Sequence, residues 1–147
     1  MSAAAAPLCL LDTHVVLDWV LFDDPRCRVW ADAVQQGALR WIHTAGMLDE
    51  ALRVVHYPAL ARRHDPATSV ARVRQCFASW SECRPVAPLQ PALQCSDADD
   101  QMFVDLALQH GARWLLTRDH ALLRLARPAA ARGLRIVRPE SDAPAAG

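Results

Sequence analysis

The chain has 147 residues, of which 52% are hydrophobic, and its 16 acidic residues balance 16 basic residues that are all arginine. This length suffices for one domain with its own core, and the hydrophobic fraction excludes an intrinsically disordered protein. The longest apolar runs fall far short of the ~20 residues that cross a bilayer, and the segment before Asp12 lacks the basic start and long apolar run of a secretion signal.

Five cysteines are scattered along the chain without a Cys-x-x-Cys pair. Cys9 and Cys76 fall within apolar periodicities, where cysteine behaves as a small hydrophobic residue. We therefore expect neither a zinc site nor a disulfide framework, and we expect a cytoplasmic protein. The Ala- and Pro-rich ends predict flexible tails at residues 1–7 and 139–147, on either side of one domain at 8–138.

Apolar runs alternate with amphipathic stretches along this domain. In the first half they predict a strand at 8–11, a helical stretch at 15–22, a helix from Asp24 to Gly37, a strand at 40–43, a helix capped by Thr44 that stops before Pro58, and a helix from Asp65 to about Cys83. Two of these helices begin with an aspartate followed by proline, a common start because proline is tolerated at the first helical position.

The second half continues the alternation. It predicts a weak third strand at 84–87, a loop at 88–96, a helix capped by Ser96 or Asp97 that ends near Gly111, a strand at 114–116, a helix at 120–126 and a last strand at 134–137. Strands that alternate with helices usually form a parallel sheet covered on both faces. The sequence therefore predicts an α/β protein, a three-layer α/β/α sandwich with a central parallel sheet of four or five strands.

Four carboxylates follow strands or open helices at places where such a fold would bring them together. Asp12 ends the first strand, and Asp119 follows the fourth. Asp100 starts an amphipathic helix, and Glu50 lies in the first turns of the helix after the second strand. The carboxyl ends of parallel strands share one edge of the sheet, where ligand sites form. Because these acids repel one another and the chain has no lysine, the pattern predicts one or two divalent cations, Mg²⁺ or Mn²⁺, which prefer oxygen ligands.

Further polar residues stand close to these acids in the sequence. Asp97 and Asp99 precede Asp100; Asp97 is better placed as an N-cap, and Asp99 competes with Asp100 for the metal. Thr117 lies two residues before Asp119, so its hydroxyl points to the same face and supports the site. We assign supporting roles to all three of these additional residues.

Arginines gather on both sides of this acidic set. Residues 113–138 contain seven arginines and one acid, and residues 53–74 contain five arginines and one acid. A negative centre between arginine-rich segments suits a phosphate backbone whose scissile group needs a metal. Arg53 and Arg118 are candidate contacts to such a phosphate backbone, although Arg118 fits an ordinary surface arginine equally well.

Four motifs in order resemble the PIN-domain ribonucleases. They are Leu-Leu-Asp-Thr-His-Val-Val-Leu at 10–17, Glu-Ala-Leu-Arg-Val-Val at 50–55, the aspartate-rich turn and helix at 97–112, and Leu-Leu-Thr-Arg-Asp at 115–119. Each motif alone is weak, because an apolar run before an aspartate is common. All four in this order and spacing make a strong resemblance, which extends over residues 8–138.

The sequence resembles in particular the bacterial PIN-family toxins of toxin–antitoxin systems. The resemblance implies a sheet in the order 3-2-1-4-5 and a Mg²⁺- or Mn²⁺-dependent endoribonuclease. Its catalytic and metal-binding acids would be Asp12, Glu50, Asp100 and Asp119. The resemblance also implies an RNA substrate, a cognate antitoxin protein and frequent homodimerisation.

One departure from the family concerns the residue after Thr13. His14 replaces the asparagine that usually follows the Asp-Thr pair and that can brace Asp12 or a bound water. A neutral histidine offers one donor and one acceptor with a longer reach, so Thr13 and His14 are assigned supporting roles. The alternative to a nuclease is therefore a catalytically weak PIN fold that serves as a binding or regulatory module.

Other α/β classes fit less well. A phospho-receiver domain and a haloacid-dehalogenase-type phosphatase both need a lysine, which this chain lacks, and a P-loop nucleotidase needs a Gly-Lys-Ser/Thr motif. The five tryptophans fall in apolar periodicities and are expected in the core or at a dimer interface rather than as base-stacking platforms.

Overall fold

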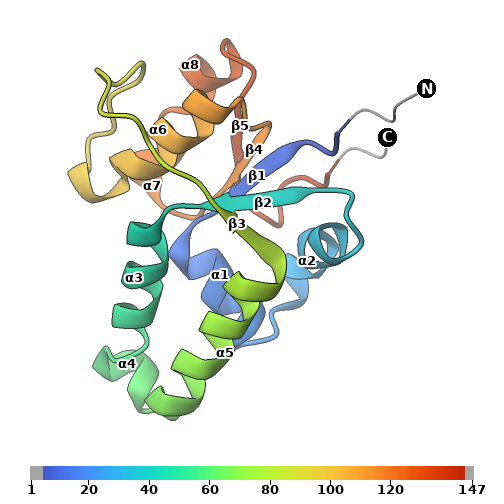
Figure 1. Ribbon diagram of the computed structural model, residues 1–147, viewed down its shortest axis with the longest axis vertical. Coiled ribbons are helices and arrows are strands. Elements are labelled where there is room, and N and C mark those ends of the chain that lie inside the picture. Colours follow the sequence, from blue (N-terminus) through green and yellow to red (C-terminus); the bar gives the residue numbers. More distant parts are fainter. Residues whose placement is uncertain (1–4, 145–147) are drawn as a thin grey trace.

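A parallel β-sheet forms the centre of the computed structural model, which describes residues 5–144 (Figure 1). The strands within this range are β1 (Leu8–Leu11), β2 (Arg40–His43), β3 (Ser81–Cys83), β4 (Trp114–Leu116) and β5 (Arg135–Val137). They pair in the order β3-β2-β1-β4-β5, and each neighbouring pair is parallel. The α/β/α fold class and the strand order predicted from the sequence are confirmed.

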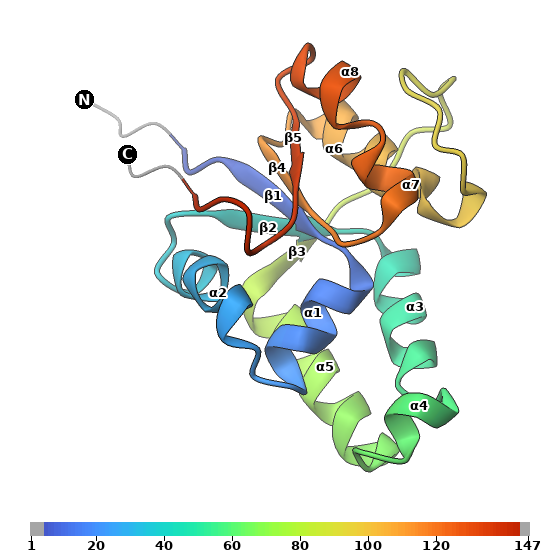
Figure 2. The ribbon, with the colours of Figure 1, turned by 180° about the vertical axis from the view of Figure 1, so that it is seen from behind.

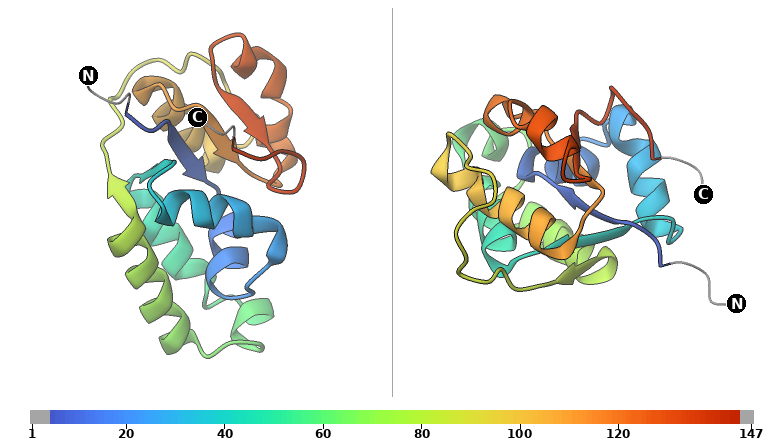
Figure 3. Two further views of the ribbon diagram at one scale, coloured as in Figure 1. Left: turned by 90° about the vertical axis from the view of Figure 1, so that its right-hand side faces the viewer. Right: turned by 90° about the horizontal axis from the view of Figure 1, so that it is seen from above.

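Helices cover both faces of the sheet (Figures 1 and 2). The described helices are α1 (Thr13–Val20), α2 (Arg28–Gln35), α3 (Ala45–Val54), α4 (Pro58–Ala61), α5 (Pro66–Trp80), α6 (Gln101–His110), α7 (His120–Leu123) and α8 (Ala126–Ala130), with short 3₁₀ helices at Pro25–Cys27 and Ala98–Asp100. The helices α1, α2, α3 and α5 pack on one face, and α6, α7 and α8 pack on the other. Figure 3 shows the two layers from the side and from above.

The strands are apolar on both faces, as expected for a sheet covered by two helical layers. Cys9, Trp41 and Trp114 face the α1 side, and they belong to a core that also includes Trp30. Leu10, Ile42 and Leu115 alternate with them and face the α6 side. The rings of Trp30 and Trp114 meet edge to face with centroids 5.0 Å apart, so the tryptophans of the strands serve the core.

Several helix boundaries lie where the sequence signals them. The Thr44 hydroxyl accepts a hydrogen bond from the amide of Met47, and the Asp65 carboxylate accepts one from the amide of Thr68. Each side chain satisfies an amide that has no partner within its helix. The helix α6 ends at Gly111, whose φ of +68° is a left-handed conformation that glycine adopts without a steric penalty.

Two predicted elements need correction. The third strand lies at Ser81–Cys83 rather than at 84–87, so α5 ends at Trp80 instead of near Cys83. Pro85 has no amide hydrogen for a strand ladder, whereas the three residues from Ser81 pair in register with β2.

The predicted helix 120–126 is also divided, into α7 and α8. Pro128 could not donate to the carbonyl of Arg124, and its ring would clash there, if one helix continued through this region. A new helix that starts at Ala126 places Pro128 in the first turn, where no donor is needed.

The ends of the chain are only partly described. The tails predicted at 1–7 and 139–147 extend outside the described residues, and their flexibility stays a prediction. Pro139 is buried, however, and its carbonyl accepts a hydrogen bond of 2.9 Å from the Trp30 indole. Between residues 5 and 144, none of the helices has the length and apolar character needed to cross a membrane.

Candidate active site

The candidate site lies at the carboxyl-terminal edge of the sheet, where β1 and β4 end side by side. Asp12 follows β1 directly and precedes α1, and Asp119 precedes α7 a few residues after β4. The amide of Asp12 donates to the carbonyl of Leu116 at 2.9 Å, which continues the ladder between the two strands. Adjacent parallel strands therefore bring Asp12 and Asp119 to the same edge, as predicted.

Three aspartates form the centre of this site. One carboxylate oxygen from each of Asp97, Asp100 and Asp119 lies within 4.8 Å of the other two. Asp100 is only 8% exposed, and its Oδ2 atom is buried without a hydrogen-bond partner among the described residues. The structure therefore brings Asp100 and Asp119 together as predicted. It also places Asp97, predicted only as a supporting residue, within the group.

The protonation of Asp100 reflects this crowding. Burial, the neighbouring Asp119 side chain, and the charges of Asp119, Asp12 and Asp97 together raise the pKa of Asp100 to about 8. Burial also raises the pKa of Asp12, although the Thr117 hydroxyl and the charge of His14 oppose this effect. Like charges at close range cannot all ionise without a counter-charge.

Thr117 connects two of the predicted acids. Its hydroxyl donates to Asp12 Oδ2 at 2.6 Å and accepts from the amide of Asp119 at 2.9 Å. The side chain is fully buried, so neither bond competes with water. One hydroxyl thus fixes the orientation of the Asp12 carboxylate and the position of the Asp119 backbone.

Glu50 reaches the site from α3. Its Oε2 atom accepts a hydrogen bond of 2.8 Å from the hydroxyl of Thr13, the residue after Asp12. Thr13 is buried and Glu50 is half-buried, which directs the Glu50 carboxylate toward the beginning of α1. His14 is exposed beside them, and it only partly opposes the rise that burial causes in the pKa of Asp12 and Asp18.

The remaining predicted residues lie at the margin or point elsewhere. Asp99 is exposed, and its amide donates to Asp97 Oδ1. Arg53 is exposed on α3. Arg118 does not turn toward the three aspartates, because its guanidinium group forms ion pairs with Asp18 and Glu140. Roles of Arg53 and Arg118 in binding RNA stay predictions.

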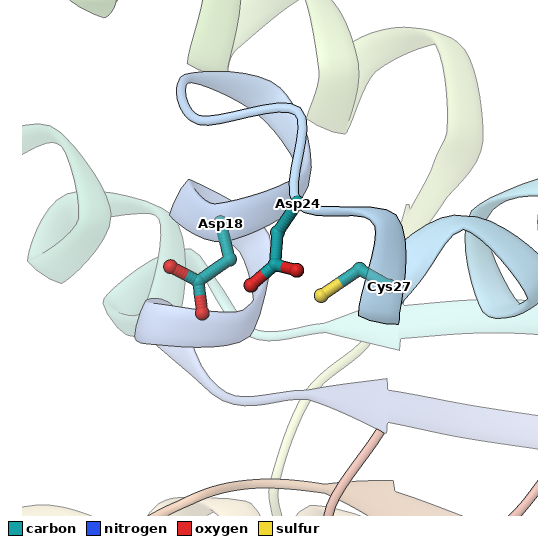
Figure 4. A group of neighbouring side chains, drawn as sticks. All are labelled: Asp18, Asp24 and Cys27. Carbon is teal, nitrogen blue, oxygen red and sulfur yellow. The ribbon is translucent and has the colours of Figure 1, made fainter. Parts of the chain in front are cut away.

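A second acidic group surrounds Arg118, and no local pattern in the sequence indicates it. Asp18, Asp24 and Cys27 each offer one atom within 4.8 Å of the others (Figure 4). The Asp24 carboxylate is also held by Arg26 at 2.8 Å and lies 3.8 Å from Arg118. Arginine side chains thus already supply the positive charge that a cation would bring, so these acids form a structural ion-pair network.

The group at the sheet edge has no such compensation. Among residues 5–144, none of Asp12, Asp97, Asp100 or Asp119 forms an ion pair with an arginine. Several carboxylates around a buried oxygen without a partner match the oxygen-rich ligand set that Mg²⁺ and Mn²⁺ prefer. The residues present therefore fit a divalent cation.

Fold and site together define a class of protein, a parallel α/β/α domain with a carboxylate centre at the carboxyl ends of β1 and β4. The PIN domain family profile matches residues 9–121, well over half of the chain. The chain therefore belongs to the PIN-domain family, a family of nucleases.

Among solved structures, the chain is similar to VapBC2 from Rickettsia felis bound to a DNA fragment from its promoter. The TM-score is 0.61 at 11% sequence identity, and the match covers 88% of this chain and 96% of the other. At this identity the similarity concerns the fold. No curated protein sequence matches the chain.

Proposed function

We propose that this PIN domain is a Mg²⁺- or Mn²⁺-dependent endoribonuclease and the toxin of a toxin–antitoxin pair. The observation that carries the proposal is the buried, unpartnered Oδ2 atom of Asp100 within a group of aspartates that no arginine neutralises. The motifs that resemble PIN-family toxins and the fold shared with VapBC2 support it further.

We assign the metal to Asp100 and Asp119, with Asp97 as an additional ligand and with Asp12 and Glu50 completing the acidic set. A bound divalent ion would supply positive charge that stabilises the negative charge developing on the phosphate oxygens during hydrolysis. In the metal-free protein Asp100 would hold a proton at neutral pH. A bound cation would supply positive charge in place of that proton and so favour its release.

The other residues of the site orient these carboxylates. Thr117 keeps Asp12 and the Asp119 backbone at a fixed separation, and Thr13 holds one oxygen of Glu50. Such pre-arrangement reduces the reorganisation that binding of substrate and metal would otherwise require.

Cleavage of RNA by the purified protein tests the nuclease. We expect cleavage in Mg²⁺ or Mn²⁺, loss of cleavage in EDTA, and a loss of at least about a hundredfold in Asp12→Asn and Asp100→Asn. Both substitutions keep the side-chain size but remove a charged ligand. Asp32→Asn, at an exposed position on α2, is the matched control and should cleave at the wild-type rate.

Expression in bacterial cells tests the toxin. We expect growth arrest with the wild-type chain and normal growth with Asp100→Asn at equal protein levels. If the wild type binds RNA but cleaves no faster than Asp12→Asn in either metal, the protein is a binding or regulatory module instead.

A further inference from the structure

An open pocket lies beside the candidate active site, between the amino-terminal ends of α3 and α6. Its volume is about 530 Å³, within the range of pockets that bind small ligands. The lining combines apolar and small polar side chains, among them Thr44, Gly46, Cys83, Pro85, Val86 and Met102. None of its lining residues is acidic, although the pocket adjoins the most acidic part of the molecule.

The two helices that bound the pocket also carry or follow acids of the site. Gly46 lies one helical turn before Glu50 on α3, and residues spaced in this way are neighbours on a helix surface. Met102 lies two residues after Asp100, and its sulfur would be 3.7 Å from a Cβ atom at Gly46. The base and the phosphate of one nucleotide are joined through a single ribose. We therefore expect a base in this pocket to place its phosphate near the carboxylates.

We propose that this pocket holds one base of the RNA strand, next to the phosphate that is cut. The inference rests on the proposed nuclease function and names the part of the substrate that the site grips. Sequence-specific RNA recognition usually targets unstacked bases in single strands, which proteins hold by stacking and by hydrogen bonds. Pro85, Val86 and the polarisable thioether of Met102 offer apolar surface against which a base can pack.

Charge also favours a nucleotide as the occupant. Arg84 contributes to the lining, and its guanidinium group presents only donors, which match the carbonyl and ring-nitrogen acceptors of a base. Its ion pair with Glu82, at 2.8 Å, fixes the guanidinium beside the pocket. The amino-terminal end of α3 adds a partial positive charge, which favours the approach of a negatively charged strand.

Cys83 provides a direct probe of occupancy. It is exposed, whereas the four other free cysteines are buried, so a thiol reagent should modify Cys83 selectively. The experiment measures the rate at which iodoacetamide alkylates Cys83 in Asp100→Asn protein, in Mg²⁺, with and without a single-stranded oligoribonucleotide. Mass spectrometry of the peptide gives the rate, and fluorescence anisotropy confirms that the RNA is bound.

We expect saturating RNA to slow the alkylation of Cys83 about tenfold. An oligonucleotide of equal length that lacks its bases should leave the rate unchanged, because the backbone alone does not enter the pocket. Bound RNA that leaves Cys83 as reactive as in free protein would overturn the proposal. RNA that neither binds to nor is cleaved by the wild type would instead contradict the proposed function itself.

A substitution that fills the pocket gives a second test. A Cβ atom at Gly46 meets its nearest neighbours at ordinary contact distance, and leucine is the better helix former, so Gly46→Leu should fold. Its side chain would occupy the pocket. We expect kcat/KM for RNA to fall about tenfold, through KM, while the thermal shift caused by Mn²⁺ stays at the wild-type value. Ala59→Leu, at an exposed position on α4, is the matched control.

The two tests combine in one comparison. On a substrate that lacks the base next to the cleaved phosphate, the wild type and Gly46→Leu should cleave at equal rates, because the interaction is already lost. An antitoxin segment as the true occupant would leave RNA cleavage by Gly46→Leu unchanged and weaken only inhibition. That result would overturn the proposal.

Discussion

Two groups of carboxylates in this protein differ in what neutralises them. Asp18 and Asp24, together with Glu140, surround Arg118, and Arg26 holds Asp24 as well. The hydrogen bonds from Arg26 lower the pKa of Asp24 to about 2. At the sheet edge, burial and neighbouring acids instead raise the pKa of Asp100 to about 8. The same residue type is thus paired with arginine in one place and has no such partner in the other.

The comparison explains why clustering alone does not identify a metal site. Both groups bring three potential ligand atoms within 4.8 Å, so distance does not distinguish them. Only the group at the sheet edge has a buried carboxylate oxygen without a partner, and only there do arginines contribute no ion pair within residues 5–144. A carboxylate group without such compensation must keep a proton or bind a cation, whereas a compensated group can stay ionised without either.

Added Mn²⁺ should produce the largest change in stability, and only through the group at the sheet edge. A cation that binds the native state at 100 times its Kd stabilises a protein by about 2.7 kcal/mol, which raises Tm by several degrees for a chain of this size. Calorimetry in millimolar Mn²⁺ should show this shift in the wild type and in Asp18→Asn, but not in Asp100→Asn. An equal shift in all three proteins would mean that Mn²⁺ binds elsewhere.

Removal of the arginine should convert the compensated group into an uncompensated one. Arg118→Met keeps much of the side-chain volume but leaves Asp18 and Glu140 without their partner. Because both sides of the pair are only partly exposed, we expect a loss of about 2 kcal/mol in the free energy of unfolding, measured by urea denaturation. Arg28→Met is the control, since its ion pair with Asp23 is fully at the surface and should contribute little. A loss no greater than in Arg28→Met would show that Arg118 does not stabilise its acidic neighbours.

The sequence predicted the acids at the sheet edge better than their surroundings. Asp12 and Asp119 could be placed because each follows an apolar run, and parallel strands bring their ends together. Asp97 was assigned as an N-cap, and it does accept a hydrogen bond from the amide of Asp99, yet it also belongs to the acidic group. Capping and proximity to a ligand site are compatible, so the local signal showed only one of the two roles.

Contacts between distant segments could not be predicted. Arg118 meets Asp18, which lies 100 positions earlier, and no local pattern reports such a pairing. The pocket likewise forms between α3, the segment after β3, and α6. The predicted position of β3 was wrong by three residues, because a short strand beside a proline has too few residues to show a period of two.

Stability of the metal-free protein should depend on pH through Asp100. Its native pKa lies above the unfolded value of 3.8, so the native state binds the proton more tightly. The resulting stabilisation is complete below about pH 4 and is lost as the pH rises toward 8. Urea denaturation of wild type and Asp100→Asn in EDTA isolates this effect, because contributions from other groups, such as the buried His43, cancel in the difference.

We expect the free energy of unfolding of Asp100→Asn to increase relative to that of the wild type by more than about 1 kcal/mol between pH 5 and pH 8. The difference should grow steadily as the pH rises. A constant difference across this range would mean that Asp100 has an ordinary pKa. Asp24→Asn should show no growing gain there, because Asp24 is ionised throughout the range.

Thr117 offers the smallest and most local test of the group at the sheet edge. Thr117→Val keeps the shape of the side chain but removes the hydroxyl between Asp12 and the Asp119 amide. We expect a loss of about 1 kcal/mol in stability, since the partly buried Asp119 amide loses its acceptor. Cleavage should fall about tenfold through kcat, because the Asp12 carboxylate and the Asp119 backbone lose their fixed orientation. Thr117→Ser restores the hydroxyl and should recover most of the lost stability and most of the lost kcat. If valine lowers stability but leaves kcat unchanged, Thr117 is structural only, and the orientation of Asp12 must depend on the strand ends alone.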